Sequence, residues 1–225
     1  MKISIAIPAY KYNDNCLLYL EELLESIYKQ DYSNYEVIIS DHTKNDDYID
    51  IVNKYKSLMD LKYFKNTECL GNISANTNNA IKKCTGDIIK VMHQDDSFYL
   101  EDTLSKISIE LEKNPNKKWG ACGFTHNFTK ENSIKNPMIP SLENTIGCPS
   151  VSFFRRNIEE PDLYDENLYL LLDKDFHDEL FKKYKDPLII KDICILIRMH
   201  GENSQFKLES EMFSDLLKIE NKNKR

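Results

Sequence analysis

The chain has 225 residues, 41% hydrophobic and 30% charged, with a formal charge of −7 at pH 7 and an isoelectric point near 5.3. This composition is typical of one folded domain, or of one domain with an appendage. The acidic balance argues against a nucleic-acid partner, because neutralising phosphates needs a concentrated basic face. The sequence contains no apolar run of about 18 residues and no signal-peptide pattern at its start, so we expect a cytoplasmic protein without a transmembrane segment.

The first half of the chain alternates short β-rich runs with longer helical patterns, which is typical of βαβ units and a largely parallel sheet. The first strand is a compact apolar run that is expected to stop at Pro8. The helices show apolar residues at spacings of three and four, and Gly86 and Pro115 end two of them. In chain order we predict a strand at 3–7, a helix at 17–27, a strand at 35–40, a helix at 46–58, a strand at 61–65, a helix at 73–84, a strand at 87–93 and a helix at 100–113.

Beyond residue 118 the pattern changes, although no repeat or linker divides the chain. Two strands are predicted at 119–125 and 149–154, and the polar loop between them, at 130–145, is a candidate substrate lid. A helix at 172–184 and a strand at 188–199 follow. The last predicted helix, at 208–219, carries an apolar stripe for which we favour packing on the core over contact with a membrane or partner; its members are Leu208, Met212, Leu216 and Ile219.

Residues just after the strands deserve inspection, because ligands of open α/β sheets bind at the carboxyl ends of the strands. The segment Pro8-Ala9-Tyr10 follows the first strand, Asp41 the second, and Asp95-Asp96 the fourth. Two adjacent acids at the end of a buried strand repel each other, and a bound Mg²⁺ or Mn²⁺ relieves that repulsion. The alternative is a solvated acidic turn or a helix cap, which is the interpretation we favour for Asp46-Asp47.

Six segments resemble, in the correct order, the inverting family 2 glycosyltransferases with the GT-A fold. They span most of the chain, and their order makes the resemblance specific even though each segment is short. The segments are ISIAIPAY at 3–10, YEVIISDHTKNDD at 35–47, LGNISANTNNAIKKCTGDIIKVMHQDD at 70–96, GCPSVSFFRR at 147–156, DENLYLLLDKDF at 165–176 and IRMHGENS at 197–204.

The resemblance implies a single GT-A-type, Rossmann-like domain with a mixed, mostly parallel sheet flanked by helices. Residues 1–97 would bind the nucleotide sugar, 98–205 would form the acceptor and catalytic half, and 206–225 a C-terminal helix and polar tail. The implied reaction is metal-dependent, inverting transfer of a sugar from a nucleoside-diphosphate sugar, with a UDP-sugar preferred, to a hydroxyl group. The implied acceptor is a carbohydrate or a lipid-linked glycan, which would place the reaction in polysaccharide or glycoconjugate synthesis. Peripheral contact with the membrane would place the protein at its inner, cytoplasmic face.

The resemblance also assigns roles to individual residues. A divalent cation, Mn²⁺ or Mg²⁺, would be held by Asp96 and His200, and Asp173 would deprotonate the acceptor, with Asp175 as the runner-up. On a helix these two acids point about 200° apart, so only one can face a given acceptor. The residues expected to contact the donor are Pro8, Ala9, Tyr10, Asp41, Asn78, His93, Asp95 and Arg198.

Three positions depart from the family pattern. The chain has His93 where the family commonly has aspartate, Thr77 where it has arginine, and Leu172 where it has glutamate. These departures suggest one alternative, a catalytically silent nucleotide-sugar-binding module. A second alternative is a metal-dependent phosphoesterase or nucleotidyltransferase that uses Asp95 and Asp96. The first predicts donor binding without turnover, and the second predicts hydrolysis or pyrophosphate chemistry.

Overall fold

One mixed sheet organises the part of the chain that the computed structural model describes, which comprises residues 1–128, 133–142, 145–157, 159–200 and 209–223. Its strands are β1 (Ile3–Ala9), β2 (Tyr35–Asp41), β3 (Leu61–Lys65), β4 (Ile88–Val91), β5 (Ser97–Phe98), β6 (Trp119–Phe128), β7 (Ser133–Met138), β8 (Ser152–Arg155) and β9 (Leu188–Met199). The helices are α1 (Asn15–Tyr28), α2 (Ile49–Lys56), α3 (Ile73–Lys82), α4 (Thr103–Lys113), the short 3₁₀ helix η1 (Pro149–Val151), α5 (Leu172–Tyr184) and α6 (Glu209–Asn223).

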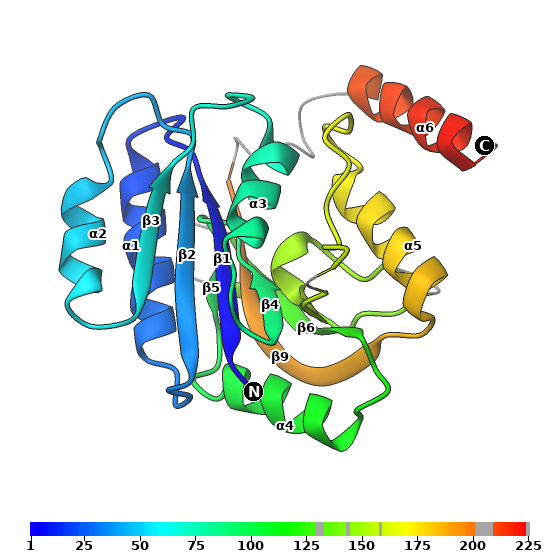
Figure 1. Cartoon of the computed structure of the whole chain (residues 1–225), viewed down its shortest axis with the longest axis horizontal. Helices are drawn as coiled ribbons and strands as arrows, with labels where there is room; N and C mark the ends of the chain where they lie inside the picture. Colours follow the sequence, from blue (N-terminus) through cyan, green and yellow to red (C-terminus); the bar gives the residue numbers. More distant parts are fainter. Residues whose placement is uncertain (129–132, 143–144, 158, 201–208, 224–225) are drawn as a thin grey trace.

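The strand order is β3-β2-β1-β4-β8-β6-β9-β5, and β7 pairs with β6. The pairs among β1, β2, β3 and β4 are parallel, as is the long pairing of β6 with β9, whereas β8, β7 and β5 join antiparallel. Most paired residues therefore lie in parallel ladders, with helices on the flanks (Figure 1). The predicted mixed, mostly parallel GT-A-type sheet is confirmed. No helix within the described ranges is both long and apolar enough to span a membrane.

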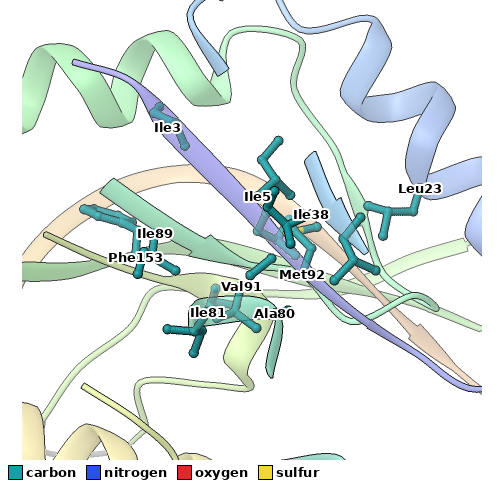
Figure 2. Packing of buried hydrophobic residues seen from close by; sticks show 14 of the residues in the cluster. Ile3, Ile5, Leu23, Ile38, Ala80, Ile81, Ile89, Val91, Met92 and Phe153 are labelled. Carbon is teal, nitrogen blue, oxygen red and sulfur yellow. The ribbon is translucent and has the colours of Figure 1, made fainter. Parts of the chain in front are cut away.

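One hydrophobic core runs through both halves of the sheet, and its first half lies where β1, β2 and β4 meet their helices. Aliphatic side chains of β1, β2 and β4 are fully or almost fully buried, and they meet side chains from α1 and α3 (Figure 2). Burying each such side chain contributes about 1.5–3 kcal/mol. Because the ladders of β1 with β2 and β4 are parallel and start together at Ile3, the carboxyl ends of these strands lie at one edge of a rigid platform.

The first strand does not stop at Pro8 as predicted, because β1 continues through Ala9. Successive residues of β1 bond alternately to its two neighbours: Ile3 donates to Asn34 before β2, whereas Ala6 accepts from Met92 after β4. The backbone nitrogen of Pro8 faces the side of β4, but the pairing of β1 with β4 ends at Ala6. The missing N–H of proline therefore costs no ladder bond.

Three predictions for the second half were wrong in part. The polar segment at 130–145 contains β7, an edge strand, where polar residues and Pro137 are tolerated; residues 130–132 and 143–144 lie outside the described residues. The strand predicted at 149–154 is η1 followed by β8. In α6 only Ile219 of the expected stripe is buried, Met212 and Leu216 are 44% and 42% exposed, and Leu208 lies outside the described residues.

Candidate functional site

The loop after β1 is fixed to the end of β4 by one buried glutamine. The side chain of Gln94 donates to the carbonyl oxygen of Tyr10 at 2.7 Å and accepts from the Tyr10 N–H at 3.0 Å. The hydroxyl of Tyr48, at the start of α2, donates to the same Gln94 oxygen at 3.0 Å. Segments that follow three different strands are thus held together at the carboxyl edge of the sheet.

A cavity of about 350 Å³ opens beside this junction, lined by the loops at 10–14 and 43–47. The phenol ring of Tyr10 is 45% exposed there, while Pro8 and Ala9 are buried in β1. A larger cavity, of about 700 Å³, lies between α1, α2 and residues 97–101 and is bordered by Arg198.

The two adjacent acids after β4 differ in their electrostatics. Asp96 is buried, and burial together with the neighbouring charge of Asp95 raises its pKa to about 7. Burial also opposes ionisation of Asp95, but a hydrogen bond with His200 and the nearby His93 bring its pKa below the usual value. At neutral pH this pair therefore holds one firmly ionised carboxylate and one that ionises only with difficulty.

The end of β9 lies directly on this acidic pair. The backbone N–H of Arg198 donates to Oδ1 of Asp96 at 3.1 Å, and its guanidinium Nε donates to the backbone oxygen of Asp95 at 3.1 Å. Nε2 of His200 lies 3.0 Å from Oδ2 of Asp95. The structure thus brings together four of the predicted residues from positions more than a hundred residues apart, although His200 pairs with Asp95 and not with Asp96.

Residues of α1 and of the loop before it hold this β9 segment in place, and the sequence analysis missed them. The rings of Tyr12 and Tyr19 stack on His200, with centroids 6.1 and 5.5 Å away. The guanidinium of Arg198 lies over the ring of Tyr19 and forms an ion pair with Glu22. The guanidinium of Arg198 is thus directed toward α1, and its predicted contact with a donor stays a prediction.

His93 occupies the position where the sequence departs from the family pattern. Its backbone N–H donates to the hydroxyl of Ser150 at 2.9 Å, and its ring Nε2 is buried without a hydrogen-bond partner among the residues that the structure describes. Burial lowers the pKa of His93 below its ordinary value. An unpaired buried polar atom costs about 1–3 kcal/mol, which a ligand with a complementary group would recover.

The predicted base, Asp173, lies in the first turn of α5. Burial raises its pKa to about 6. The thiol of Cys148 lies 3.8 Å from Oδ2 of Asp96. The pKa of this thiol lies well above its ordinary value, chiefly because of burial and further because of the charges of Asp96 and Asp173. Asp96 is therefore in contact with this thiol, and the charge of Asp173 also acts on it.

The runner-up, Asp175, has a different environment. Its side chain is buried, and Nζ of Lys222 in α6 binds its two carboxylate oxygens at 2.9 and 3.1 Å. The side chain of Asp175 is thus engaged by α6, and the choice of Asp173 as the base stays a prediction.

Two predicted donor contacts are engaged inside the protein. The buried carboxylate of Asp41 accepts hydrogen bonds from the Thr43 N–H, the Tyr63 hydroxyl and the Lys65 amino group, at 2.7, 2.6 and 3.0 Å. The amide of Asn78 donates to the backbone oxygen of Tyr164 and accepts from its N–H. Their predicted contacts with a donor remain predictions.

The acidic pair can supply only part of a divalent-cation site, and a bound ligand would have to supply the remaining oxygen atoms. No group of three or more histidine, cysteine, aspartate or glutamate side chains is arranged for a metal within the ranges that the structure covers. Magnesium and manganese, however, are commonly held by one or two carboxylates together with substrate phosphates and water. The raised pKa of buried Asp96 is the signature of a carboxylate that a cation would stabilise in its ionised form.

A parallel βαβ platform with polar and acidic groups at its carboxyl edge is the arrangement found in open α/β proteins, whose ligands generally bind at that edge. The sequence model of "Glycosyl transferase family 2" matches residues 4–168. The chain therefore belongs to glycosyltransferase family 2, as the six ordered segments indicated.

Two curated relatives illustrate the relationship. The GalNAc(5)-diNAcBac-PP-undecaprenol β-1,3-glucosyltransferase of Campylobacter jejuni is 27% identical over 178 residues, which are 75% of this chain and 56% of that protein. The poly(ribitol-phosphate) β-glucosyltransferase of Bacillus spizizenii is 30% identical over 192 residues, which are 82% of this chain and 26% of that protein. The chain thus spans about half or less of the length of these relatives.

Solved structures support the same fold. TarS 1–349 of Staphylococcus aureus in complex with UDP-GlcNAc superposes with a TM-score of 0.76 at 18% identity, covering 97% of this chain and 65% of that one. The mannosyltransferase PcManGT of Pyrobaculum calidifontis, in complex with GDP-Man and Mn²⁺, gives a TM-score of 0.71 at 16% identity, covering 98% and 63%. At these identities the likeness establishes the GT-A fold.

Proposed function

We propose that the chain transfers a sugar from a nucleoside-diphosphate sugar to a hydroxyl acceptor, with inversion at the anomeric carbon. One observation carries the proposal: the acidic pair Asp95-Asp96 at the carboxyl edge of the sheet is joined to the end of β9 through the backbone and guanidinium of Arg198 and the ring of His200. Displacement at a sugar carbon needs a group that stabilises the leaving diphosphate and a base on the opposite side. The membership in family 2 supports this assignment of the two acidic positions.

Asp173 is the proposed base. With a pKa of about 6 it is mostly ionised at neutral pH, yet it is more basic than an ordinary aspartate. A general base is most effective when its pKa lies near the working pH. Its Oδ atoms would take the proton of the acceptor hydroxyl while that oxygen attacks the anomeric carbon.

Asp96 is the proposed ligand of Mn²⁺ or Mg²⁺, together with diphosphate oxygens, and His200 would act beside it. When bound, the cation supplies Lewis-acid stabilisation of the negative charge on the leaving diphosphate. Support comes from the Mn²⁺ in the structure of the related mannosyltransferase. The contribution of the protein is to keep Asp96 buried and oriented by the backbone of Arg198.

The proposed donor is a UDP-sugar, since TarS has been solved with UDP and with UDP-GlcNAc. Tyr10, His93 and Asp95 would contact it directly, whereas Asp41 and Asn78 would shape the site from behind. Residues 1–97 would bind the donor and 98–205 the acceptor.

The proposed acceptor is a lipid-linked or surface glycan, and the proposed location is the cytoplasm at the inner face of the membrane. The support is that the relative from Campylobacter jejuni carries an undecaprenol-linked acceptor in its name.

A binding panel followed by a transfer assay tests the proposal. UDP, GDP, CDP and dTDP are added with and without Mn²⁺, and the midpoint of thermal unfolding is followed. A nucleotide at a hundredfold excess over its Kd should stabilise the protein by about 2.7 kcal/mol. The matching nucleotide sugar is then incubated with hydroxyl acceptors. Binding without turnover would favour the silent module, and release of sugar phosphate or pyrophosphate the phosphoesterase or nucleotidyltransferase.

A further inference from the structure

The C-terminal helix α6 holds the start of α5 through a buried carboxylate. Asp215 is 1% exposed, and its Oδ2 accepts hydrogen bonds from the N–H groups of Tyr169, Leu170 and Leu171 at 2.8, 2.7 and 3.1 Å. The first N–H groups of a helix have no partner within the helix. Leu171 occupies the capping position of α5 and provides no side-chain cap. Only the N–H of Leu171 belongs to the capping position, so Asp215 caps α5 by anchoring the three residues that lead into the helix, from a position 44 residues beyond Leu171.

Two lysines of α6 extend this attachment along the same segment. Nζ of Lys218 donates to the backbone oxygen of Asn167 at 2.8 Å and pairs with Oδ1 of Asp215 at 3.2 Å. Nζ of Lys222 pairs with the carboxylate of Asp175 at 2.9 Å. The side chains of α6 thus contact residues on both sides of the α5 N-terminus, and Figure 1 shows the two helices together at the end of the molecule away from α1 and α2.

The position of Asp173 depends on this attachment. Asp173 is the second residue of α5, two positions after Leu171, whose N–H Asp215 binds. The attachment thus engages positions on both sides of Asp173, at Leu171 and at Asp175. Hydrogen bonds from backbone N–H groups to an ionised carboxylate are about twice as strong as hydrogen bonds between neutral groups. The three bonds to Asp215 therefore hold residues 169–171 firmly.

We propose that Asp215 is a positioning residue for the reaction: by capping α5 it fixes the backbone from which the base, Asp173, reaches the acceptor. This inference rests on the proposed function, because it takes Asp173 as the base. A displacement of about 1 Å in a catalytic group can cost on the order of a hundredfold in rate. Loosening the α5 N-terminus should therefore lower kcat, while the donor site at the ends of β1 and β4 keeps its affinity.

The test compares Asp215→Ala and Asp215→Asn with Glu220→Ala, which removes an exposed acid of the same helix. All variants are made in the full chain, and circular dichroism checks their folding. We expect kcat to fall about ten- to a hundredfold in Asp215→Ala. We expect a smaller loss in Asp215→Asn, whose amide oxygen still accepts hydrogen bonds, and no loss in Glu220→Ala. The Kd for UDP should stay within about twofold in all three, and hydrogen exchange should accelerate at the amides of residues 169–171 in Asp215→Ala.

Three outcomes would overturn the inference. Unchanged kcat in folded Asp215→Ala would show that the cap does not position the base. Loss of kcat and of UDP affinity in the same proportion would show a general effect on folding. Absence of any transfer by the wild-type protein would remove the proposed function itself and the positioning role with it, and this result is distinguishable because it appears before any substitution.

Discussion

Replacing Asp173 with asparagine should make the folded protein more stable while it removes the base. Burial raises the pKa of Asp173 from 3.8 to about 6, so ionisation of this side chain at neutral pH opposes folding. At about 1.4 kcal/mol per pKa unit the full effect is about 3 kcal/mol. Because the side chain keeps some contact with solvent, we expect a measured gain of about 1–3 kcal/mol. The same substitution should lower kcat by about 10²–10⁴-fold.

The sign of the pH dependence follows from the direction of the shift. A carboxyl group whose pKa is higher in the folded state than in the unfolded state favours folding while it is protonated, and this advantage disappears as the pH rises from about 3.8 to about 6. The difference in the free energy of unfolding between Asp173→Asn and wild type should therefore be near zero at pH 4 and reach its full value by pH 7.5. Urea denaturation at both pH values measures it.

Asp178→Asn is the matched control, because it removes the same charge from a position of α5 whose side chain is 47% exposed. It should change stability by less than about 0.5 kcal/mol at either pH. The reasoning would be refuted if Asp173→Asn were less stable than wild type at pH 7.5, or if its gain were equal at pH 4.

Three further predictions address other acids. Lys222→Ala leaves the buried carboxylate of Asp175, whose pKa burial already raises, without its cation, so it should destabilise the protein by about 1–2 kcal/mol in urea denaturation at pH 7.5; unchanged stability would contradict the pairing. Because burial and Asp95 raise the pKa of Asp96 to about 7, Mn²⁺-dependent affinity for UDP should be about tenfold weaker at pH 6 than at pH 8 by calorimetry, and equal affinities would argue against Asp96 as the ligand. Burial opposes ionisation of Glu36, but the ion pairs and hydrogen bonds of this fully buried side chain hold its pKa well below the ordinary value. Its stabilisation is therefore present above about pH 4.5 and lost as the pH falls; Glu36→Gln should cost about 2–3 kcal/mol at pH 7 and less at pH 3, and an equal cost at both would exclude this linkage.

Much of the fold could be predicted because its first half follows local rules. Apolar runs bounded by turn residues gave β1 to β4, and helical spacing gave α1 and α3 to within a few residues. The errors arose in segments whose local composition is not typical of a strand but whose position in the sheet allows one. Pro8 lies within β1 because its side of the ladder has already ended, and polar β7 forms because an edge strand needs only one partner.

The candidate site was predictable only where its residues follow a strand. Asp95 and Asp96 come directly after β4, so their place at the sheet edge follows from topology. The residues that hold the site in place were not predictable, since they contact it across long stretches of chain: Glu22 meets Arg198 across 176 positions. Asp215 was missed for the same reason, because an acid on a predicted apolar helix has no local pattern that identifies it as a cap for another helix.

The most direct test of the central assignment is a calorimetric titration of UDP into the wild-type protein and into Asp96→Asn, with and without Mn²⁺. The account predicts that Mn²⁺ tightens UDP binding by at least about tenfold in wild type and has no effect in Asp96→Asn. Binding of UDP that is equally tight in both proteins, and indifferent to Mn²⁺, would contradict a cation-assisted donor site at the end of β4.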